Sequence, residues 1–376
     1  MATMTAPRAA GTIAAASGIM NRLESLDVFR GLTMASMVMV NNAGDWTNVY
    51  APLRHAEWHG WTFTDMVFPF FLWIVGVAMT LSTARRVERG ENNSDLIAHA
   101  FRRAAIIFAI GLLLNGFPHY NLSTIRIPGV LQRIAICYLI ATLIFLYTNW
   151  KGQLAAIAGC LASYWAMMAP WGYGKGSTFA QYVDGLYLKG HMYGATKTWD
   201  PEGIVSTLPA IGTALFGFLC GHLLRAGLTD TAKALWMAGI GAALTIAGLI
   251  TDAWQPINKQ LWTVPYTMLM AGLAFLVFGA CYYIVDVRGL RGRWTKPLVI
   301  MGMNAMAVYI LSGTIARLMS LIQVSQGVSL KMYLYRGLFA PLASPINSSL
   351  LWALANVAVC WLAAWGMYRR GWFLKF

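Results

Sequence analysis

Residues 27–76 read DVFRGLTMASMVMVNNAGDWTNVYAPLRHAEWHGWTFTDMVFPFFLWIVG, which is two apolar segments joined by a polar loop. Each apolar segment approaches the length that an α-helix needs to cross the hydrocarbon core of a bilayer. The loop holds His55, with carboxylates nearby in the sequence at Glu57 and Asp65. Because histidine transfers protons near neutral pH, the loop is a candidate catalytic site. An interfacial aromatic loop whose histidine only satisfies hydrogen bonds explains the same residue types equally well.

The composition of the whole chain indicates a membrane protein. Of its residues, 58% are hydrophobic and 11% are charged, whereas about a quarter are charged in soluble domains. Mean hydropathy is +0.56, and apolar runs of about 20 residues recur along the chain, the length of a membrane-spanning helix. The fold class predicted is therefore an all-α polytopic membrane protein. The net charge of +14 is assigned to cytoplasmic loops and not to nucleic-acid binding, because such loops collect lysine and arginine.

Ten transmembrane helices are predicted from the apolar runs. The expected spans are about Val28–Asn41, Met66–Thr83, Ala104–Phe117, Pro128–Tyr147, Leu154–Pro170, Ile204–Leu224, a span after Lys233 that ends near Asp252, Leu261–Val285, Leu298–Ile322 and Leu350–Tyr368. A short amphipathic piece at Met332–Leu342 could be a re-entrant or interfacial helix.

With ten spans, the arginine-rich segments 85–103, 288–296 and 369–375 fall on one side of the membrane. The positive-inside rule makes that side cytoplasmic and places both termini there. The loop with His55 then faces the extracytoplasmic side, together with the insertion Trp171–Glu202. We expect residues 1–21 to form a flexible cytoplasmic tail, because they contain no continuous apolar run. Residues 22–376 form a single transmembrane domain.

Several kinds of chemistry lack support in the sequence. The chain contains no GxxxxGK[ST], HExxH or GxSxG motif, which leaves ATP-driven transport, zinc hydrolysis and an α/β-hydrolase triad without a signature. The five cysteines lie far apart within apolar runs, so we interpret them as small core residues and predict no metal site.

Polar side chains inside the apolar runs are candidate functional residues, because such groups are costly at bilayer depth. The set is Asp27, Arg30, Asn41, Asn42, Gln132, Arg133, Asn304 and Arg317. Asp27 and Arg30 share one helical face, where a local ion pair is an equally good explanation. Arg133 has no adjacent acid, so its partner is either a phosphate or a buried carboxylate from elsewhere. For Asn304, hydrogen bonding between helices is the simpler explanation.

The extracytoplasmic loops combine aromatic rings with acids. The members are Trp58, Trp61, Trp171, Tyr173, Tyr182, Tyr187, Tyr193 and Trp199, with Asp200, Glu202 and Asp252. Aromatic belts at the membrane interface explain many of these rings without a ligand. A sugar site also uses aromatic faces and carboxylates, and position in the sequence does not separate the two.

Nine ordered blocks of sequence together resemble one known family. They are LDVFRG at 26–31, VN at 40–41, HAEWHG at 55–60, DMVFP at 65–69, RIPGVLQR at 126–133, DPEG at 200–203, NKQLW at 258–262, GMN at 302–304 and YRR at 368–370. The chain resembles the heparan-α-glucosaminide N-acetyltransferase family and its bacterial relatives. The resemblance implies an acetyltransferase of the bacterial inner membrane, multi-pass and homodimeric. It would move acetyl from cytosolic acetyl-CoA to the amine of an extracytoplasmic glucosamine.

The resemblance also implies site residues. The family's active histidine corresponds to His55 and its neighbouring asparagine to Asn41, and we add Asp65 to this catalytic set. Acetyl-CoA is expected to contact the basic residues of the family blocks and two polar neighbours, which are Arg30, Arg133, Gln132 and Asn304. The expected acceptor contacts are Asp27, Glu57, Trp58, Asp200 and Glu202.

The acceptor predicted is a small amino sugar or a periplasmic glycan, not a long heparan chain. The run Asn42–Asp45 replaces an aromatic-plus-glycine run of the animal members. Their luminal N-terminal domain and extra first span are also expected to be missing here.

Two mechanisms and two other protein classes stay open at this level. His55 either deprotonates the acceptor amine or carries the acetyl group transiently; we favour the direct transfer. Asp65 either orients the imidazole, holds the amine, or only caps the second span. An amino-sugar transporter fits the buried arginines and aromatic outer loops, although we find no inverted repeat. A structural scaffold fits less well, because it does not need His55, Asn41 and Arg133 at bilayer depth.

Overall fold

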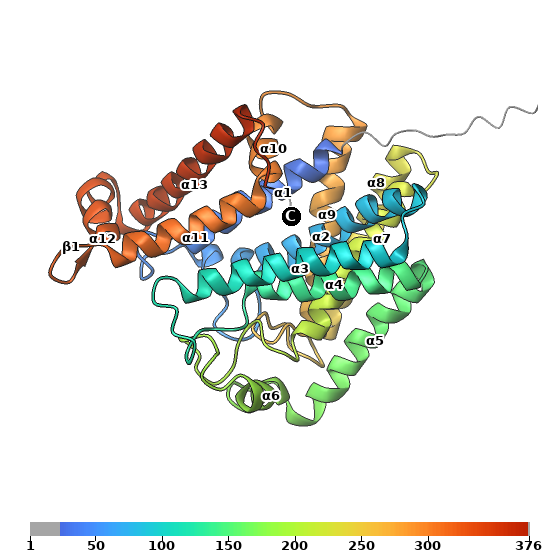
Figure 1. Cartoon of the computed structure of the whole chain (residues 1–376), viewed down its shortest axis with the longest axis horizontal. Coiled ribbons are helices and arrows are strands. Elements are labelled where there is room, and N and C mark those ends of the chain that lie inside the picture. Colours follow the sequence, from blue (N-terminus) through green and yellow to red (C-terminus); the bar gives the residue numbers. More distant parts are fainter. Residues whose placement is uncertain (1–22, 375–376) are drawn as a thin grey trace, which may run out of the picture.

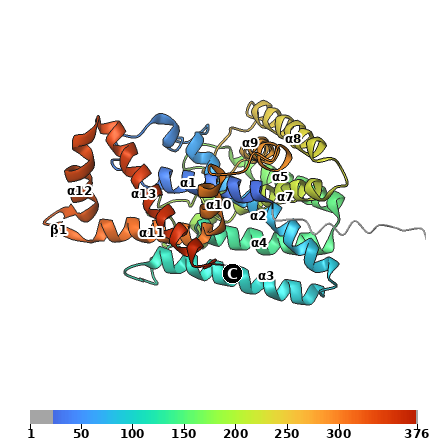
Figure 2. The same cartoon turned by 90° about the horizontal axis from the view of Figure 1, so that it is seen from above.

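A computed structural model of the chain describes residues 23–374, so the predicted tail at 1–21 lies outside the described residues. The helices of the bundle pack side by side (Figures 1 and 2). They are α1 (Glu24–Asn41), α2 (Phe63–Glu88), α3 (Asn93–Gly116), α4 (Val130–Tyr147), α5 (Trp150–Met168), α7 (Thr207–Arg225), α8 (Asp230–Thr251), α9 (Val264–Tyr282), α10 (Thr295–Met303), α11 (Ala305–Leu321) and α13 (Pro345–Arg369).

The remaining elements are short. They are the helices α6 (Phe179–Tyr187) and α12 (Leu330–Leu334), the 3-10 turns η1 (Ala51–Leu53), η2 (Ala169–Trp171) and η5 (Ala340–Leu342), and the π-helical turns η3 (Tyr283–Val287) and η4 (Tyr335–Phe339). Strands β1 (Gln323–Ser325) and β2 (Val328–Ser329) form an antiparallel hairpin after α11.

The all-α polytopic class is confirmed. In the described part of the chain, eight helices are long and apolar enough to span a membrane, and α10 with α11 forms a ninth candidate that is bent by 79°. The tenth expected span is α1, whose first two turns carry Glu24, Asp27 and Arg30. The segment Met332–Leu342 is divided among α12, η4 and η5, none of which is long enough to span a bilayer.

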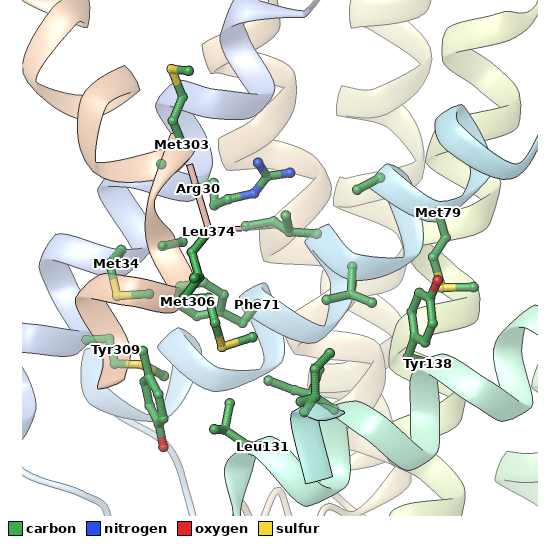
Figure 3. A pocket seen from close by; sticks show the side chains of 18 of the residues that line it. Arg30, Met34, Phe71, Met79, Leu131, Tyr138, Met303, Met306, Tyr309 and Leu374 are labelled. Atoms are coloured by element: carbon green, nitrogen blue, oxygen red, sulfur yellow. The ribbon is translucent and has the colours of Figure 1, made fainter. Parts of the chain in front are cut away.

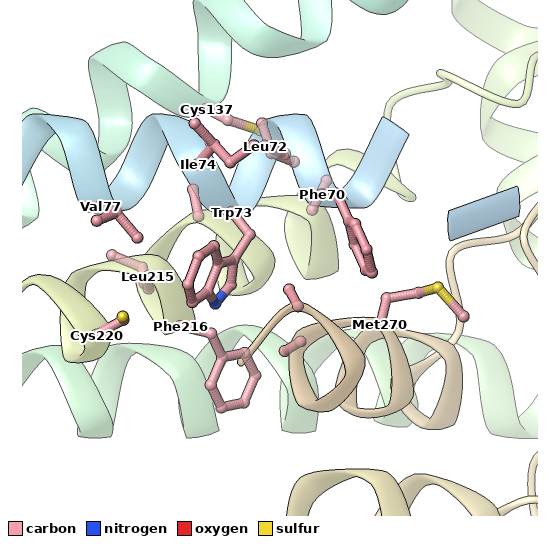
Figure 4. Packing of buried hydrophobic residues seen from close by; sticks show 14 of the residues in the cluster. Phe70, Leu72, Trp73, Ile74, Val77, Cys137, Leu215, Phe216, Cys220 and Met270 are labelled. Carbon is pink, nitrogen blue, oxygen red and sulfur yellow. The ribbon is translucent and has the colours of Figure 1, made fainter. Parts of the chain in front are cut away.

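The central helix is α2, which packs against α7 through small residues. A Cβ atom on Gly76 would lie 1.9 Å from the carbonyl oxygen of Ala214, and one on Gly217 would lie 2.1 Å from that of Trp73. Glycine is therefore required at both positions for the two backbones to approach so closely. The Trp73 ring is fully buried beside α7 and α9 (Figure 4), with its centroid 5.2 Å from that of Phe275.

A second, smaller apolar cluster joins α1 to the C-terminal helices. Its buried members are Met34, Val38, Ile300, Met301, Val308, Cys360 and Ala364. The C-terminal group of α10 to α13 lies on the other side of α1 from α7 (Figures 1 and 2). Between this group and α2 to α4 lies a large cavity, which is described below.

The polar loops meet at one end of the bundle. Trp58 Nε1 donates to the carbonyl oxygen of Tyr173 at 2.9 Å, and the amide of Gly60 donates to that of Ile257 at 2.7 Å. We call this the outer end, because the distribution of cations predicts it to be extracytoplasmic. The opposite end is called the inner end.

Candidate active site

The residues of the candidate catalytic pair lie in direct contact. His55 Nδ1 donates a hydrogen bond to Asp65 Oδ1 at 2.6 Å. The Asp65 side chain is 1% exposed, whereas that of His55 is 46% exposed. A carboxylate on Nδ1 selects the tautomer whose proton is on Nδ1. The other ring nitrogen, Nε2, is then left as a proton acceptor on the exposed side of the pair.

Asp65 also holds the start of α2. Its Oδ2 atom accepts the backbone N–H of Thr62 at 3.1 Å and that of Ala56 at 3.0 Å. One carboxylate therefore caps the helix with one oxygen and orients the imidazole with the other. Both roles that the sequence left as alternatives, imidazole orientation and capping, are present in the geometry.

The loop around His55 is anchored by its neighbours. Trp58 packs edge-on against Trp199 with ring centroids 5.4 Å apart. Asn258 is fully buried, and its side-chain amide lies 3.5 Å from His59 Nδ1. Glu57 is exposed and forms no hydrogen bond or ion pair with residues 23–374. Trp58 thus has a structural role in packing the outer loops together, which explains its position without a sugar contact.

A large cavity has a volume of about 560 Å³ and is lined by α1, α2, α3, α4, α10 and α11 (Figure 3). Asp27, Arg30 and Arg103 line its inner part, together with Phe373 and Leu374 of the C-terminal segment. Much of the remaining wall is apolar and rich in methionine. Arg103 was not among the predicted site residues, although its position at the inner end beside Arg102 is visible in the sequence.

A second cavity of about 140 Å³ adjoins the first at the outer end. Met34, Met37 and Tyr309 line both cavities. Asn41, at the end of α1, lines the second one. Together the two cavities follow α1 from Arg30 to Asn41, which is about three helical turns or on the order of 16 Å.

The catalytic loop lies beside this outer end of α1. Leu53 of η1 and Val40 of α1 line the same small recess, and they lie close in the sequence to His55 and Asn41, respectively. His55 itself is not among the described residues that line the two larger cavities.

The structure corrects two predicted donor contacts on α4. Leu131, Ile134 and Tyr138 face the large cavity, which puts Arg133 on the other side of the helix. Its Nη2 atom donates to the carbonyl oxygen of Gly203 at 3.1 Å. Arg133 also hydrogen-bonds the Ser206 hydroxyl, and its guanidinium lies over the Trp262 ring, 5.0 Å from the centroid.

Gln132 also lies away from the large cavity. A Cβ atom on Gly111 would come within 2.5 Å of Gln132 Oε1, so α3 and α4 approach closely at this point. Gln132 and Arg133 are therefore buried between neighbouring elements, and neither lines the large cavity.

Asn304 stands at the bend between α10 and α11. It is 1% exposed, and its side-chain amide has no hydrogen-bond partner among the described residues. The expected hydrogen bond between helices is therefore absent from that part of the chain. Its neighbours Met303 and Ala305 line the large cavity, but Asn304 does not.

Asp27 is the clearest error among the expected acceptor contacts. Arg30 Nη1 donates to Asp27 Oδ1 at 3.3 Å, as the local ion-pair explanation predicted. Asp27 lies near the inner end of α1, and Asn41 is its last residue. The separation along the helix is on the order of 20 Å, so Asp27 does not share an acceptor site with the outer loops.

Asp200 and Glu202 are also corrected, because both are paired with Arg126. Arg126 donates to Asp200 through Nε at 2.8 Å and through Nη2 at 2.5 Å, and it also hydrogen-bonds Glu202. Both carboxylates are buried. Burial acts against the charge of Arg126, but the bonds and attraction from Asp200 and Glu202 raise its pKa above its ordinary value.

Two further charged residues, Lys259 and Asp184, lie near this cluster. Burial raises the pKa of Glu202, but attraction from Arg126 and Lys259 outweighs it and lowers that pKa below its ordinary value. Burial raises the pKa of the nearby Asp184 to about 6, although two backbone N–H groups donate to its carboxylate. The cluster thus holds the loop before α7 in place, and its carboxylates are occupied.

We expect Arg126→Gln to destabilise the protein by about 3–5 kcal/mol, because it leaves two buried carboxylates without their cation. Thermal unfolding in detergent measures the effect, and Lys189→Gln, at an exposed position in a nearby loop, should leave the midpoint unchanged. The triple variant Arg126→Gln/Asp200→Asn/Glu202→Gln should recover part of the loss. An Arg126→Gln protein as stable as wild type would show that the cluster contributes nothing.

No group of three or more histidine, cysteine, aspartate or glutamate side chains that could hold a metal ion occurs in residues 23–374. The chemistry that the candidate site offers comes from an imidazole that a buried carboxylate orients.

Comparison with known proteins gives one family. The family model for heparan-alpha-glucosaminide N-acetyltransferase, catalytic, matches residues 22–251. The heparan-alpha-glucosaminide N-acetyltransferase of Mus musculus is 29% identical over 359 residues, which covers 77% of this chain and 53% of the relative. The Homo sapiens protein of the same name is 29% identical over 362 residues, covering 78% and 53%. The chain spans about half the length of the curated relatives it matches.

Proposed function

This chain belongs to the heparan-alpha-glucosaminide N-acetyltransferase catalytic family, and on that premise we propose that it is an acetyl-CoA-dependent N-acetyltransferase. The donor is cytosolic acetyl-CoA, and the acceptor is the amine of an extracytoplasmic amino sugar such as glucosamine. We place the protein in a bacterial inner membrane as a multi-pass homodimer. The acceptor and the membrane follow from the resemblance of the sequence blocks to the bacterial relatives.

The observation that carries the proposal is the 2.6 Å contact between His55 and Asp65. A histidine whose Nδ1 proton is held by a buried carboxylate presents Nε2 as a general base. In direct transfer, Nε2 removes a proton from the acceptor amine as its nitrogen attacks the thioester carbon. The tetrahedral intermediate then collapses with loss of the CoA thiolate, which takes up a proton, and the products are the N-acetylated sugar and CoA.

The adjoining cavities support a donor path. A volume of about 560 Å³ is within the range of small-molecule sites, about 300–1,000 Å³. Arg30 and Arg103 at the inner end offer guanidinium groups to the phosphates of CoA. The apolar wall suits the pantetheine arm, and the amide of Asn41 is available to the developing oxyanion at the outer end.

The proposal is tested with purified protein in nanodiscs, ¹⁴C-acetyl-CoA and a panel of amines that includes glucosamine. We expect labelled N-acetylglucosamine and free CoA in equal amounts. N-acetylglucosamine as acceptor is the matched control, because it lacks the free amine and should give no labelled product. No transfer to any amine, together with glucosamine uptake into proteoliposomes without acetyl-CoA, would instead identify a transporter.

A further inference from the structure

The smaller cavity at the outer end is lined in part by an arginine that the proposed reaction does not use. Its polar lining consists of Asn41, Asn42, Asn115, Ser312 and Arg317, with Tyr309 at the junction to the larger cavity. Arg317 belongs to the last turns of α11. It lies beyond residues 22–251, the part of the chain that the family model matches.

Two of the amides in this cavity already have partners. The Asn42 side chain donates to the carbonyl oxygen of Val38 at 2.7 Å and to Ser312 Oγ at 3.0 Å. The Asn115 side chain donates to the carbonyl oxygens of Arg126 and Pro128 at 2.9 and 3.0 Å. These bonds hold the wall of the cavity in place.

Arg317 is different. Its Nη1 atom is buried and has no hydrogen-bond partner among residues 23–374, and no ion pair involves Arg317 in that part of the chain. Arg126 is held by its own two carboxylates, Asp200 and Glu202. The Arg317 side chain as a whole is half-buried. A guanidinium stays charged in proteins, and a buried N–H group without a hydrogen-bond partner costs free energy. Arg317 therefore offers its charge to an anion that comes from outside the chain.

The phosphates of the donor are not that anion in the proposed arrangement. They face Arg30 and Arg103 at the inner end, and only the uncharged acetyl end of the donor reaches Asn41. The cavity of about 140 Å³ has room for about four or five waters. It is thus large enough for an acidic substituent and part of a sugar ring.

We propose that Arg317 binds a carboxylate or phosphate carried by the acceptor, so that the preferred acceptors are amino sugars with an acidic substituent. The inference rests on the proposed function, because it takes the bound sugar to be the acetyl acceptor. Binding of the acidic sugar to Arg317 does not itself require acetyl transfer. Arg317 is thereby a specificity-determining residue, and Asn41 in the same cavity brings the acidic group close to the site of transfer.

The test is calorimetric binding without acetyl-CoA, so its result does not depend on catalysis. The probes are glucosamine 6-phosphate and muramic acid, each compared with glucosamine, on protein in phosphatidylcholine nanodiscs. Wild type should bind the acidic sugars about 10- to 100-fold more tightly than glucosamine, as expected for charge-assisted hydrogen bonds. Arg317→Gln should bring this ratio to about one, and Arg317→Lys should give an intermediate ratio, because lysine lacks the planar fork.

The matched control is Arg336→Gln, which removes one positive charge from an exposed position in the neighbouring η4 and should keep the wild-type ratio. If the wild-type protein binds acidic and neutral sugars with equal affinity, the proposal is overturned, and no variant is needed to show it. Loss of the preference in Arg336→Gln as well also overturns it, since a diffuse surface charge is then responsible.

The phosphate of a lipid headgroup could bind Arg317 by the same chemistry. A second set of titrations distinguishes a lipid from the sugar as the source of the anion. The titrations are repeated in nanodiscs that contain phosphatidylglycerol. An unchanged ratio supports the sugar as the source of the anion. If phosphatidylglycerol abolishes the preference in wild type, a lipid occupies the cavity and the proposal fails. If wild type binds acidic sugars selectively but acetylates none, this inference stands and the proposed function falls.

Discussion

Replacement of His55 by alanine is expected to lower the kcat for acetyl transfer by about 100- to 10,000-fold, the usual contribution of a general base. The fold should survive the change. The imidazole is half exposed, and Asp65 keeps the backbone donors Thr62 and Ala56. The measurement is kcat with ¹⁴C-acetyl-CoA and glucosamine, on protein whose thermal unfolding midpoint matches that of wild type.

His119→Ala is the matched control, because His119 is an exposed histidine in another outer loop. Its kcat should stay within about twofold of the wild-type value, as for most exposed sites remote from the chemistry. Acid quenching after a single turnover then separates the two roles of His55. Direct transfer leaves no label on the protein, whereas a nucleophilic histidine leaves acetyl-enzyme. A well-folded His55→Ala protein with wild-type activity would exclude both.

Asp65→Asn is expected to lower kcat by about 100-fold or more, while the KM for the acceptor changes little. The physical reason is the tautomer of His55. An asparagine can keep its oxygen on the amides of Thr62 and Ala56, but it then presents an NH₂ group to Nδ1. The imidazole responds by carrying its proton on Nε2, where it is a donor and no longer a base.

Stability and activity should therefore separate in this variant. Thermal unfolding should show little loss, since the cap of α2 is retained, and the rate assay should show the full effect. Asp252→Asn is the matched control, because Asp252 accepts the amide of Ile257 at 2.6 Å in another outer loop and has no imidazole partner. An Asp65→Asn enzyme with an unchanged kcat would mean that the carboxylate only caps the helix.

The sequence by itself determined the helical class, the approximate positions of the spans and the candidate status of His55, Asn41 and Asp65. These features depend on local properties of the chain. Apolar length sets a membrane span, and the ten-residue spacing of His55 and Asp65 across one loop lets the start of α2 bring them together. The loop is short enough that one carboxylate serves both the helix cap and the imidazole.

Ion pairs between residues far apart in the sequence were determined only by the tertiary structure. Asp200 and Glu202 were expected to bind the acceptor, but Arg126 holds both from more than 70 positions away in the sequence. Nothing in a sequence tells whether a carboxylate faces a ligand or an arginine of its own chain, because either partner satisfies the same charge.

The rotation of each helix about its own axis was also not determined by the sequence. Residues Leu131 and Ile134 face the cavity, whereas Arg133 points to the loop before α7. In a helix that is apolar on nearly every side, periodicity does not say which face meets the cavity. Arg103 and Arg317 were identified as cavity residues only when α3 and α11 had been placed against α1. The sequence determined which residues are expensive to bury, and the packing of the helices decided what each of them faces.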